Sequence, residues 1–108
     1  MSAFTLSVVF VSSRFIRMIN REYLSHDYVT DVVSFPLGAG PGPDGEIYVN
    51  LDRAASQARH YKVPVRTETR RLIIHGLLHV LGYDDATQRA KRAMTRRENT
   101  YLEQLHST

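Results

Sequence analysis

The sequence predicts an α+β fold, a single domain over residues 1–108 in which a mixed β-sheet packs against helices. Three observations lead to this prediction. A chain of 108 residues fits one domain, because two separate cores would each be too small to fold alone. Strand-like and helical segments alternate at first, and the C-terminal half is helical. Hydrophobic residues make up 43% and charged residues 23%, which excludes a disordered chain or a collagen-like repeat.

The N-terminal third predicts two strands and a helix. Residues 5–12 (TLSVVFVS) are apolar and largely β-branched, which is typical of a strand. Ser13 is placed to cap a helix over residues 14–24, where apolar residues fall at helical spacing. Residues 29–36 (VTDVVSFP) predict a second strand, which Pro36 ends.

A loop, a strand and a helix follow. Residues 38–45 (GAGPGPDG) carry four glycines and two prolines, a composition typical of a loop. Residues 46–50 (EIYVN) alternate apolar and polar side chains and predict a third strand. Asp52 is placed to cap a helix that runs to about residue 61.

The C-terminal half predicts two further helices. Pro64 marks an entry point, and the segment 67–81 is apolar nearly all round, which is typical of a buried helix. Gly82 fits a helix stop. The last predicted helix, over residues 87–105, is basic early and apolar late.

The charge of the chain favours an anionic partner. The net charge is +3, and arginine accounts for 12 of the 14 basic residues. The planar guanidinium fork suits phosphate, so the excess points toward nucleic acid, although solvated helix faces explain single arginines equally well. Two clusters flank the predicted buried helix: Arg53, Arg59, Lys62, Arg66, Arg70 and Arg71, and then Arg89, Lys91, Arg92, Arg96 and Arg97.

The compartment expected from the sequence is the cytoplasm. There is no cysteine, which excludes disulfides and thiolate metal sites and suits a reducing environment. The longest apolar run falls short of the roughly 18 residues of a membrane helix. The apolar N-terminus lacks a preceding basic region and a small-residue cleavage site, so no signal peptide is predicted.

Two histidines on the predicted buried helix form a candidate zinc site. His75 and His79 are four residues apart and therefore share one helical face. Gly82 allows a sharp chain reversal, after which Asp85 is near enough in sequence to act as a third ligand. The spacing H-x3-H-x5-D matches the metzincin skeleton, and a water would take the fourth position. The structural alternatives are a hydrogen-bonded core histidine for each imidazole and a helix N-cap for Asp85.

The residue after the first histidine narrows the chemistry. Zinc peptidases have a glutamate general base there, whereas this chain has Gly76, so peptide hydrolysis is disfavoured. A metal-bound water with a lowered pKa, together with arginines that stabilise charge on phosphate, fits phosphodiester hydrolysis. No protein side chain is assigned as the base.

These motifs resemble the YbeY family of rRNA maturation factors. The stretch 75–84 (HGLLHVLGYD) is similar to the family signature H-G-x-L-H-L-x-G-Y-D-H. Residues 20–23 (NREY), Asp27 and residues 30–36 (TDVVSFP) are similar to N-R-x-Y-R…D-x-x-T-D-V-L-S-F-P. Residues 45–47 (GEI) are similar to the G-[DE]-I start of a strand.

The resemblance implies an endoribonuclease specific for single strands, with one zinc ion and no small-molecule cofactor. It implies a part in maturing the 3′ end of small-subunit rRNA and in ribosome quality control, with single-stranded RNA and the small ribosomal subunit as partners and no membrane partner. The implied α+β domain carries the metal at one end of a cleft. The main alternative is a ribosome-assembly protein that binds RNA without cutting it and holds zinc structurally.

Two positions depart from the family pattern. Asp85 stands where the family has its third histidine, and a carboxylate is a competent zinc ligand; Asp84 matches a family residue that is not a ligand. Leu24 stands where the family has an arginine that contacts substrate phosphate, so Arg21 or Arg59 would have to substitute.

Further substrate contacts are expected from polar and basic residues near these motifs. The predicted substrate-binding residues are Arg21, Ser34 and Arg59, and Arg70 and Arg71 are further candidates for contacts with the RNA backbone; a solvated helix face is the alternative for the arginines. Ser34 and Phe35 are expected to line the cleft beside the metal, with an ordinary strand end as the alternative. Packing is the expected role of Tyr83. His26, His60 and His106 follow no pattern and are expected at the surface or in structural roles.

Overall fold

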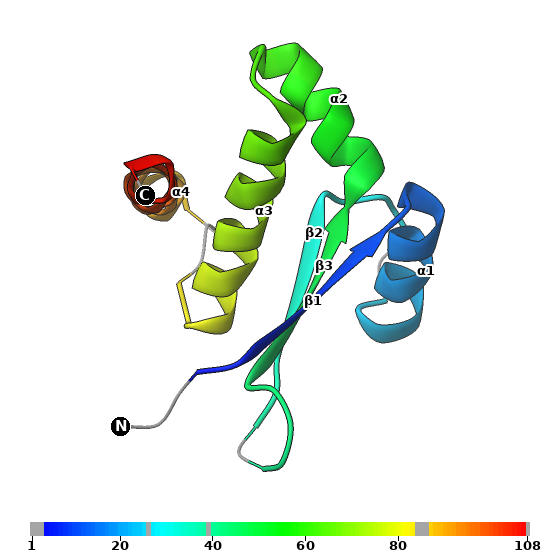
Figure 1. Ribbon diagram of the computed structural model, residues 1–108. Helices are drawn as coiled ribbons and strands as arrows, with labels where there is room; N and C mark the ends of the chain where they lie inside the picture. The colour runs from blue at the N-terminus through cyan, green and yellow to red at the C-terminus, as the bar shows by residue number, and fades with distance from the viewer. Residues whose placement is uncertain (1–3, 26, 39, 84–86, 108) are drawn as a thin grey trace.

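The computed structural model describes residues 4–25, 27–38, 40–83 and 87–107, with the backbone alone for residues 105–107. These residues form the predicted α+β fold (Figure 1). Its elements in chain order are β1 (Leu6–Val11), α1 (Ser13–Tyr23), β2 (Val32–Pro36), β3 (Gly45–Asn50), α2 (Leu51–Tyr61), α3 (Val65–Val80) and α4 (Gln88–Ser107).

The sheet is mixed, as predicted. Its strand order is β1-β3-β2, with β1 parallel and β2 antiparallel to β3. The register pairs Val8 with Ile47, and Val33 with Tyr48. The central strand β3 is therefore paired on both sides, and β1 and β2 are the two edges.

Helices cover both faces of this sheet. Alternate residues of β3 point to opposite faces: Ile47 and Val49 pack with Leu72 of α3 in one buried cluster. On the other face, Tyr48 packs against Ile16 and Ile19 of α1. Figure 1 shows the sheet between α1 and α3. This alternation places α3, which carries both candidate histidines, directly on the central strand.

α3 approaches the sheet very closely at one residue. A Cβ atom added to Gly76 would lie 2.7 Å from Cγ2 of Ile47, a side chain with no exposed surface. Only glycine fits this contact without a shift of the sheet. Gly76 thus faces the core, whereas the candidate histidines of α3, His75 and His79, are partly exposed.

α4 packs on the side of α3 away from the sheet (Figure 1). The contact is a buried cluster that joins Ile74 and Leu78 of α3 to Met94 and Leu102 of α4. Met94 and Leu102 are eight residues apart, so residue 98 lies between them on the same helical face. That residue is Glu98, which is only 6% exposed.

Both predicted helix caps are wrong by one or two residues. The N-cap of α1 is Ser12, whose hydroxyl accepts from the Phe15 amide, rather than Ser13. The N-cap of α2 is Asn50, whose side chain accepts from the amides of Asp52 and Arg53. The Asp52 carboxylate instead accepts from the Ser13 amide at 2.9 Å and so ties the two helix starts together.

The predicted elements are otherwise confirmed with shifted ends. β2 begins at Val32 rather than residue 29, because Thr30 and Asp31 hydrogen-bond to Asn50 at the end of β3 through their carbonyl groups. α3 begins at Val65, directly after Pro64. Gly82 follows α3 with φ +100, in line with its predicted role as a helix stop.

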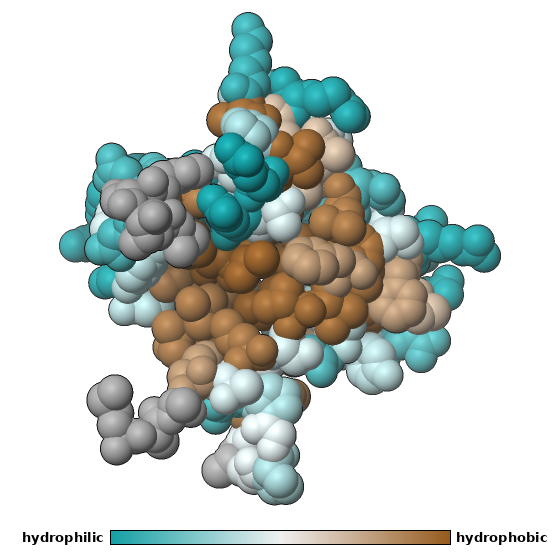
Figure 2. Space-filling model, viewed as in Figure 1, coloured by the Kyte–Doolittle hydropathy of each residue, from teal (hydrophilic) through white to brown (hydrophobic). Residues whose placement is uncertain are grey.

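The surface beside β1 is apolar. Figure 2 shows apolar side chains gathered where β1 and α3 meet. Phe10 and Leu81 are about half exposed, and Leu6, Val8 and Leu77 are partly buried. Among the helices of the described residues, none has the length and apolar character needed to span a membrane.

Candidate metal centre

His75 and His79 lie together on α3, as their spacing predicts. Their Nε2 atoms are 3.1 Å apart, and their ring centroids are 4.7 Å apart with the ring planes at 63°. Both residues are partly exposed. The two nitrogens therefore lie within hydrogen-bond distance of each other, on a partly exposed face of α3.

This pair fits two positions of a tetrahedral zinc site. Zinc–nitrogen bonds of about 2.0–2.1 Å place two tetrahedral ligand atoms about 3.3 Å apart, close to the separation of the Nε2 atoms. In the described part of the chain, no group of three or more His, Asp, Glu or Cys side chains is placed to hold a metal ion. The described residues thus supply two candidate ligands, and a third ligand has to come from elsewhere.

Asp85, the predicted third ligand, lies outside the described residues, as does Asp84. The segment on its N-terminal side ends in an ordered contact, since Arg97 of α4 stacks on the Tyr83 ring at 4.4 Å. This contact gives Tyr83 the packing role expected of it. On the C-terminal side, the Thr87 hydroxyl accepts from the Ala90 amide at 3.0 Å, so Thr87 performs the N-cap role that was the alternative for Asp85.

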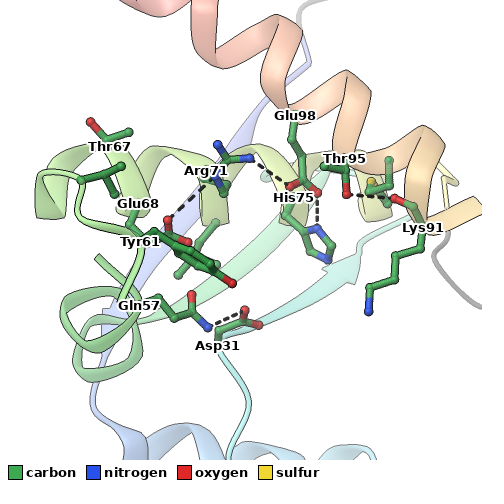
Figure 3. A pocket seen from close by; sticks show the side chains of 13 residues that line it. Asp31, Gln57, Tyr61, Thr67, Glu68, Arg71, His75, Lys91, Thr95 and Glu98 are labelled. Atoms are coloured by element: carbon green, nitrogen blue, oxygen red, sulfur yellow. Dashed lines mark hydrogen bonds and ion pairs between the residues drawn. The ribbon is translucent and has the colours of Figure 1, made fainter. Parts of the chain in front are cut away.

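His75 has a second partner on α4. Its Nδ1 lies 2.5 Å from Oε2 of Glu98. The other carboxylate oxygen of Glu98 is 3.9 Å from the Arg71 guanidinium, which also lies 3.8 Å from Glu68. Figure 3 shows Glu98 between Arg71 and the His75 ring. The histidine pair is therefore one end of a charged network across α3 and α4.

A cavity of about 660 Å³ opens beside His75. Side chains from α2, α3 and α4 line it, together with Asp31 just before β2 and Val63 between α2 and α3 (Figure 3). The polar and charged ones are Asp31, Gln57, Tyr61, Thr67, Glu68, Arg71, His75, Lys91, Thr95 and Glu98. Arg71 and Lys91 supply fixed positive charge, and Tyr61 offers an aromatic ring that is 60% exposed. The cavity thus combines these two cationic side chains with the three carboxylates of Asp31, Glu68 and Glu98.

The structure separates the predicted substrate contacts from this cavity. Arg21 lies on α1, across the sheet from α3, and lines another cavity of about 490 Å³ with Arg14 and Arg17. Ser34 is half-buried in β2, and Arg59 is exposed on α2. These three residues stay predictions, and Arg71, a further candidate, does line the cavity beside His75.

Several cavity residues were not found from the sequence. Lys91 belonged to a basic cluster without an assigned role, and Asp31, Gln57 and Glu68 come from separate elements. The sequence pattern could have identified Glu98, because this acidic residue falls at helical spacing between Met94 and Leu102 on the apolar face of α4. A carboxylate in such a stripe indicates a buried partner.

The buried carboxylate of Glu68 gives a prediction about pH. Burial, opposed by Arg71, raises the pKa of Glu68 above its ordinary value. A raised folded-state pKa means that Glu68 favours folding when protonated, and that this contribution is lost as pH rises through the folded-state pKa. We therefore expect Glu68→Gln to raise the free energy of unfolding at neutral pH and to change it little in acid.

Denaturant unfolding at about pH 7 and about pH 4 measures this effect, since the ordinary glutamate pKa is about 4.3. Glu22→Gln, at an exposed position on α1, is the matched control. A Glu68→Gln protein that is less stable than wild type at neutral pH would show that the ion pair with Arg71 outweighs the burial of the charge.

Known proteins resemble this chain over nearly its whole length. The family profile described as "Endoribonuclease YbeY" matches residues 1–106. An Endoribonuclease YbeY from Chlorobium luteolum is 45% identical over 103 residues, which covers 95% of this chain and 75% of the relative. An Endoribonuclease YbeY from Salinibacter ruber is 41% identical over 106 residues, covering 90% of this chain and 68% of the relative.

The fold agrees with a solved structure. The solution structure of TM1509 from Thermotoga maritima superposes with a TM-score of 0.67 at 30% identity, and the match covers 95% of this chain and 69% of that one. The family resemblance carried by the HGLLHVLGYD and TDVVSFP motifs is thereby confirmed: the chain belongs to the YbeY endoribonuclease family.

Proposed function

We propose that this chain is a zinc-dependent endoribonuclease that cuts single-stranded RNA in the cytoplasm. Its relatives are named as endoribonucleases. We further propose that it acts in 3′-end maturation of small-subunit rRNA and in ribosome quality control, with the small subunit as its partner, as the family resemblance implies. His75, His79 and Asp85 would hold one zinc ion.

The observation that carries this proposal is the pair of Nε2 atoms 3.1 Å apart beside the cavity that His75 lines. Bound zinc would polarise a phosphate oxygen and lower the pKa of a water to about 7. Lys91 lines the same cavity, where its charge would hold the RNA backbone and offset charge that develops on phosphate. Tyr61 would stack on an unpaired base, which favours a single strand over a duplex.

Metal content and cleavage, measured on one preparation, test the proposal. Mass spectrometry is expected to find about one zinc per chain, as a single three-ligand site would hold. Cleavage of a single-stranded RNA is expected to stop after chelation and to return with zinc, whereas the same sequence in a duplex stays intact. Cleavage that is indifferent to chelation would contradict the zinc requirement.

A second candidate is an RNA-binding protein with a structural zinc. Leu24 favours it, because this C-cap of α1 is 40% exposed and carries no charge where the family pattern has an arginine. That candidate predicts RNA binding without cleavage in the wild-type protein. The structure does not favour a zinc peptidase, because such enzymes have a glutamate base where this chain has Gly76, and an added Cβ there would lie 2.7 Å from Ile47.

Lys91 provides a test of where the RNA backbone lies. Its side chain lines the cavity next to His75, so Lys91→Gln is expected to raise KM for RNA by about three- to tenfold and to lower the slope of log affinity against log salt by about 1. Arg89→Gln, two residues before Lys91 on α4 and outside the cavity lining, is the matched control. Equal effects of the two variants would mean that the cavity does not hold the backbone and that only overall charge matters.

A further inference from the structure

The Glu98 carboxylate occupies an unusual place for a charged group. Glu98 is 6% exposed and lies between Met94 and Leu102 on the buried face of α4. Its Oε2 is 2.5 Å from Nδ1 of His75, on the side of the ring opposite Nε2. Burial of a carboxylate is costly unless the carboxylate is paired, and the contact with His75 is part of the pairing of Glu98.

The contact determines which nitrogen of His75 bears the proton. A neutral imidazole carries one proton, on either nitrogen, and only the nitrogen without it binds a metal. A carboxylate is an acceptor, so it holds the proton on Nδ1. The lone pair of His75 is then on Nε2, the atom that faces Nε2 of His79 at 3.1 Å.

We propose that Glu98 is a positioning residue for His75: it fixes the Nδ1–H tautomer and the ring orientation that the zinc site needs. The inference rests on the proposed function, because it takes His75 as a ligand. Ligating histidines commonly donate their second N–H to a carboxylate, and loss of that partner typically costs 10–100-fold in metal affinity.

Arg71 holds the carboxylate in place. Its Nη1 donates to Asn99 Oδ1 at 2.8 Å and lies 3.9 Å from Glu98 Oε1, so one guanidinium contacts two neighbouring residues of α4. The packing of Ile74 and Leu78 against Met94 fixes the spacing of the two helices. Through Glu98, the docking of α4 therefore sets the geometry of a site whose histidines both lie on α3.

Two measurements on the same variants test the role of Glu98. Glu98→Met keeps the length and the helix propensity of the side chain and removes its acceptor, whereas Glu98→Gln keeps one neutral acceptor. Two-bond proton–nitrogen NMR spectra of the metal-free protein, recorded over a pH series, report the protonation state and the tautomer of His75. Competition with a chromogenic chelator reports zinc affinity. Glu103→Met, at an exposed position on the same helix, is the matched control.

We expect a single Nδ1–H tautomer of His75 in the wild type and a mixture in Glu98→Met. Zinc affinity should fall about 10–100-fold in Glu98→Met, less in Glu98→Gln, and stay unchanged in Glu103→Met. A purely structural role would lower the thermal midpoint of Glu98→Met while its tautomer and zinc affinity stayed at the wild-type values, and this result would overturn the inference.

The tautomer measurement also separates this inference from the proposed function. If the wild type binds no zinc, the zinc-dependent mechanism fails, and the metal-free NMR spectra still decide the role of Glu98. If the wild type binds zinc and His75 shows the Nε2–H form, Glu98 does not position the ring and the zinc mechanism stands.

Discussion

Replacing His79 with alanine is expected to remove bound zinc and to abolish RNA cleavage, with the fold and RNA binding retained. His79 supplies one of the two described Nε2 atoms of the pair, so its loss leaves His75 without its neighbour at 3.1 Å. Loss of an outer partner of a ligand alone costs about 10–100-fold, so loss of the ligand itself should cost more. The side chain is partly exposed, and the buried cluster of Ile74, Leu78 and Met94 does not include it.

Zinc content, cleavage rate and RNA affinity of the His79→Ala protein together check this prediction. Glu22→Ala is the control, since Glu22 is exposed on α1, across the sheet from α3. Asp85→Ala is expected to reduce zinc content as well, because Asp85 is the proposed third ligand. Retained cleavage in His79→Ala would rule out this histidine as a ligand. RNA binding without cleavage in the wild type would favour the assembly-protein alternative.

The sequence predicted the histidine pair because its geometry is local. His75 and His79 are on one helix, and helical periodicity alone puts them on one face. The mixed sheet and the buried helix were likewise predictable from β-branched segments and from an apolar pattern. The resemblance to the YbeY family added its motifs to this reading, and the comparisons confirm the family.

The rest of the site depends on contacts between distant segments. Glu98 is 23 residues from His75 in sequence, and the two meet only because α4 packs on α3 at a particular rotation. The cavity likewise combines Asp31, Gln57 and Lys91 from three separate parts of the chain. Periodicity predicts which face a residue lies on, and it does not predict which faces meet.

The two helix caps were predicted wrongly for a different reason. Two hydrogen-bonding residues were available at each helix start, and the competition between them is decided by tertiary contacts. Asp52 is used by the Ser13 amide, which leaves Asn50 to cap α2. Local sequence does not reveal that contact, since Ser13 and Asp52 lie 39 residues apart.

Gly76→Ala is expected to lower the free energy of unfolding by about 1–3 kcal/mol, the usual cost of forcing a methyl group into a packed core. The new Cβ would lie 2.7 Å from Cγ2 of Ile47 and 3.2 Å from Cγ2 of Val32. Ile47 has no exposed surface and lies on the central strand, so it has no room to move aside. Alanine is favoured over glycine in a helix by about 0.5–1 kcal/mol, and a net loss would therefore show that the clash outweighs propensity.

Gly38→Ala is the matched control, because a Cβ there meets nothing within 4 Å. Denaturant unfolding of both variants gives the comparison. The same contact bears on the missing glutamate of zinc peptidases, because even the Cβ of a side chain at position 76 would clash with Ile47. A Gly76→Ala protein as stable as wild type would mean that α3 is free to move away from β3, and this steric argument against a peptidase would fall with it.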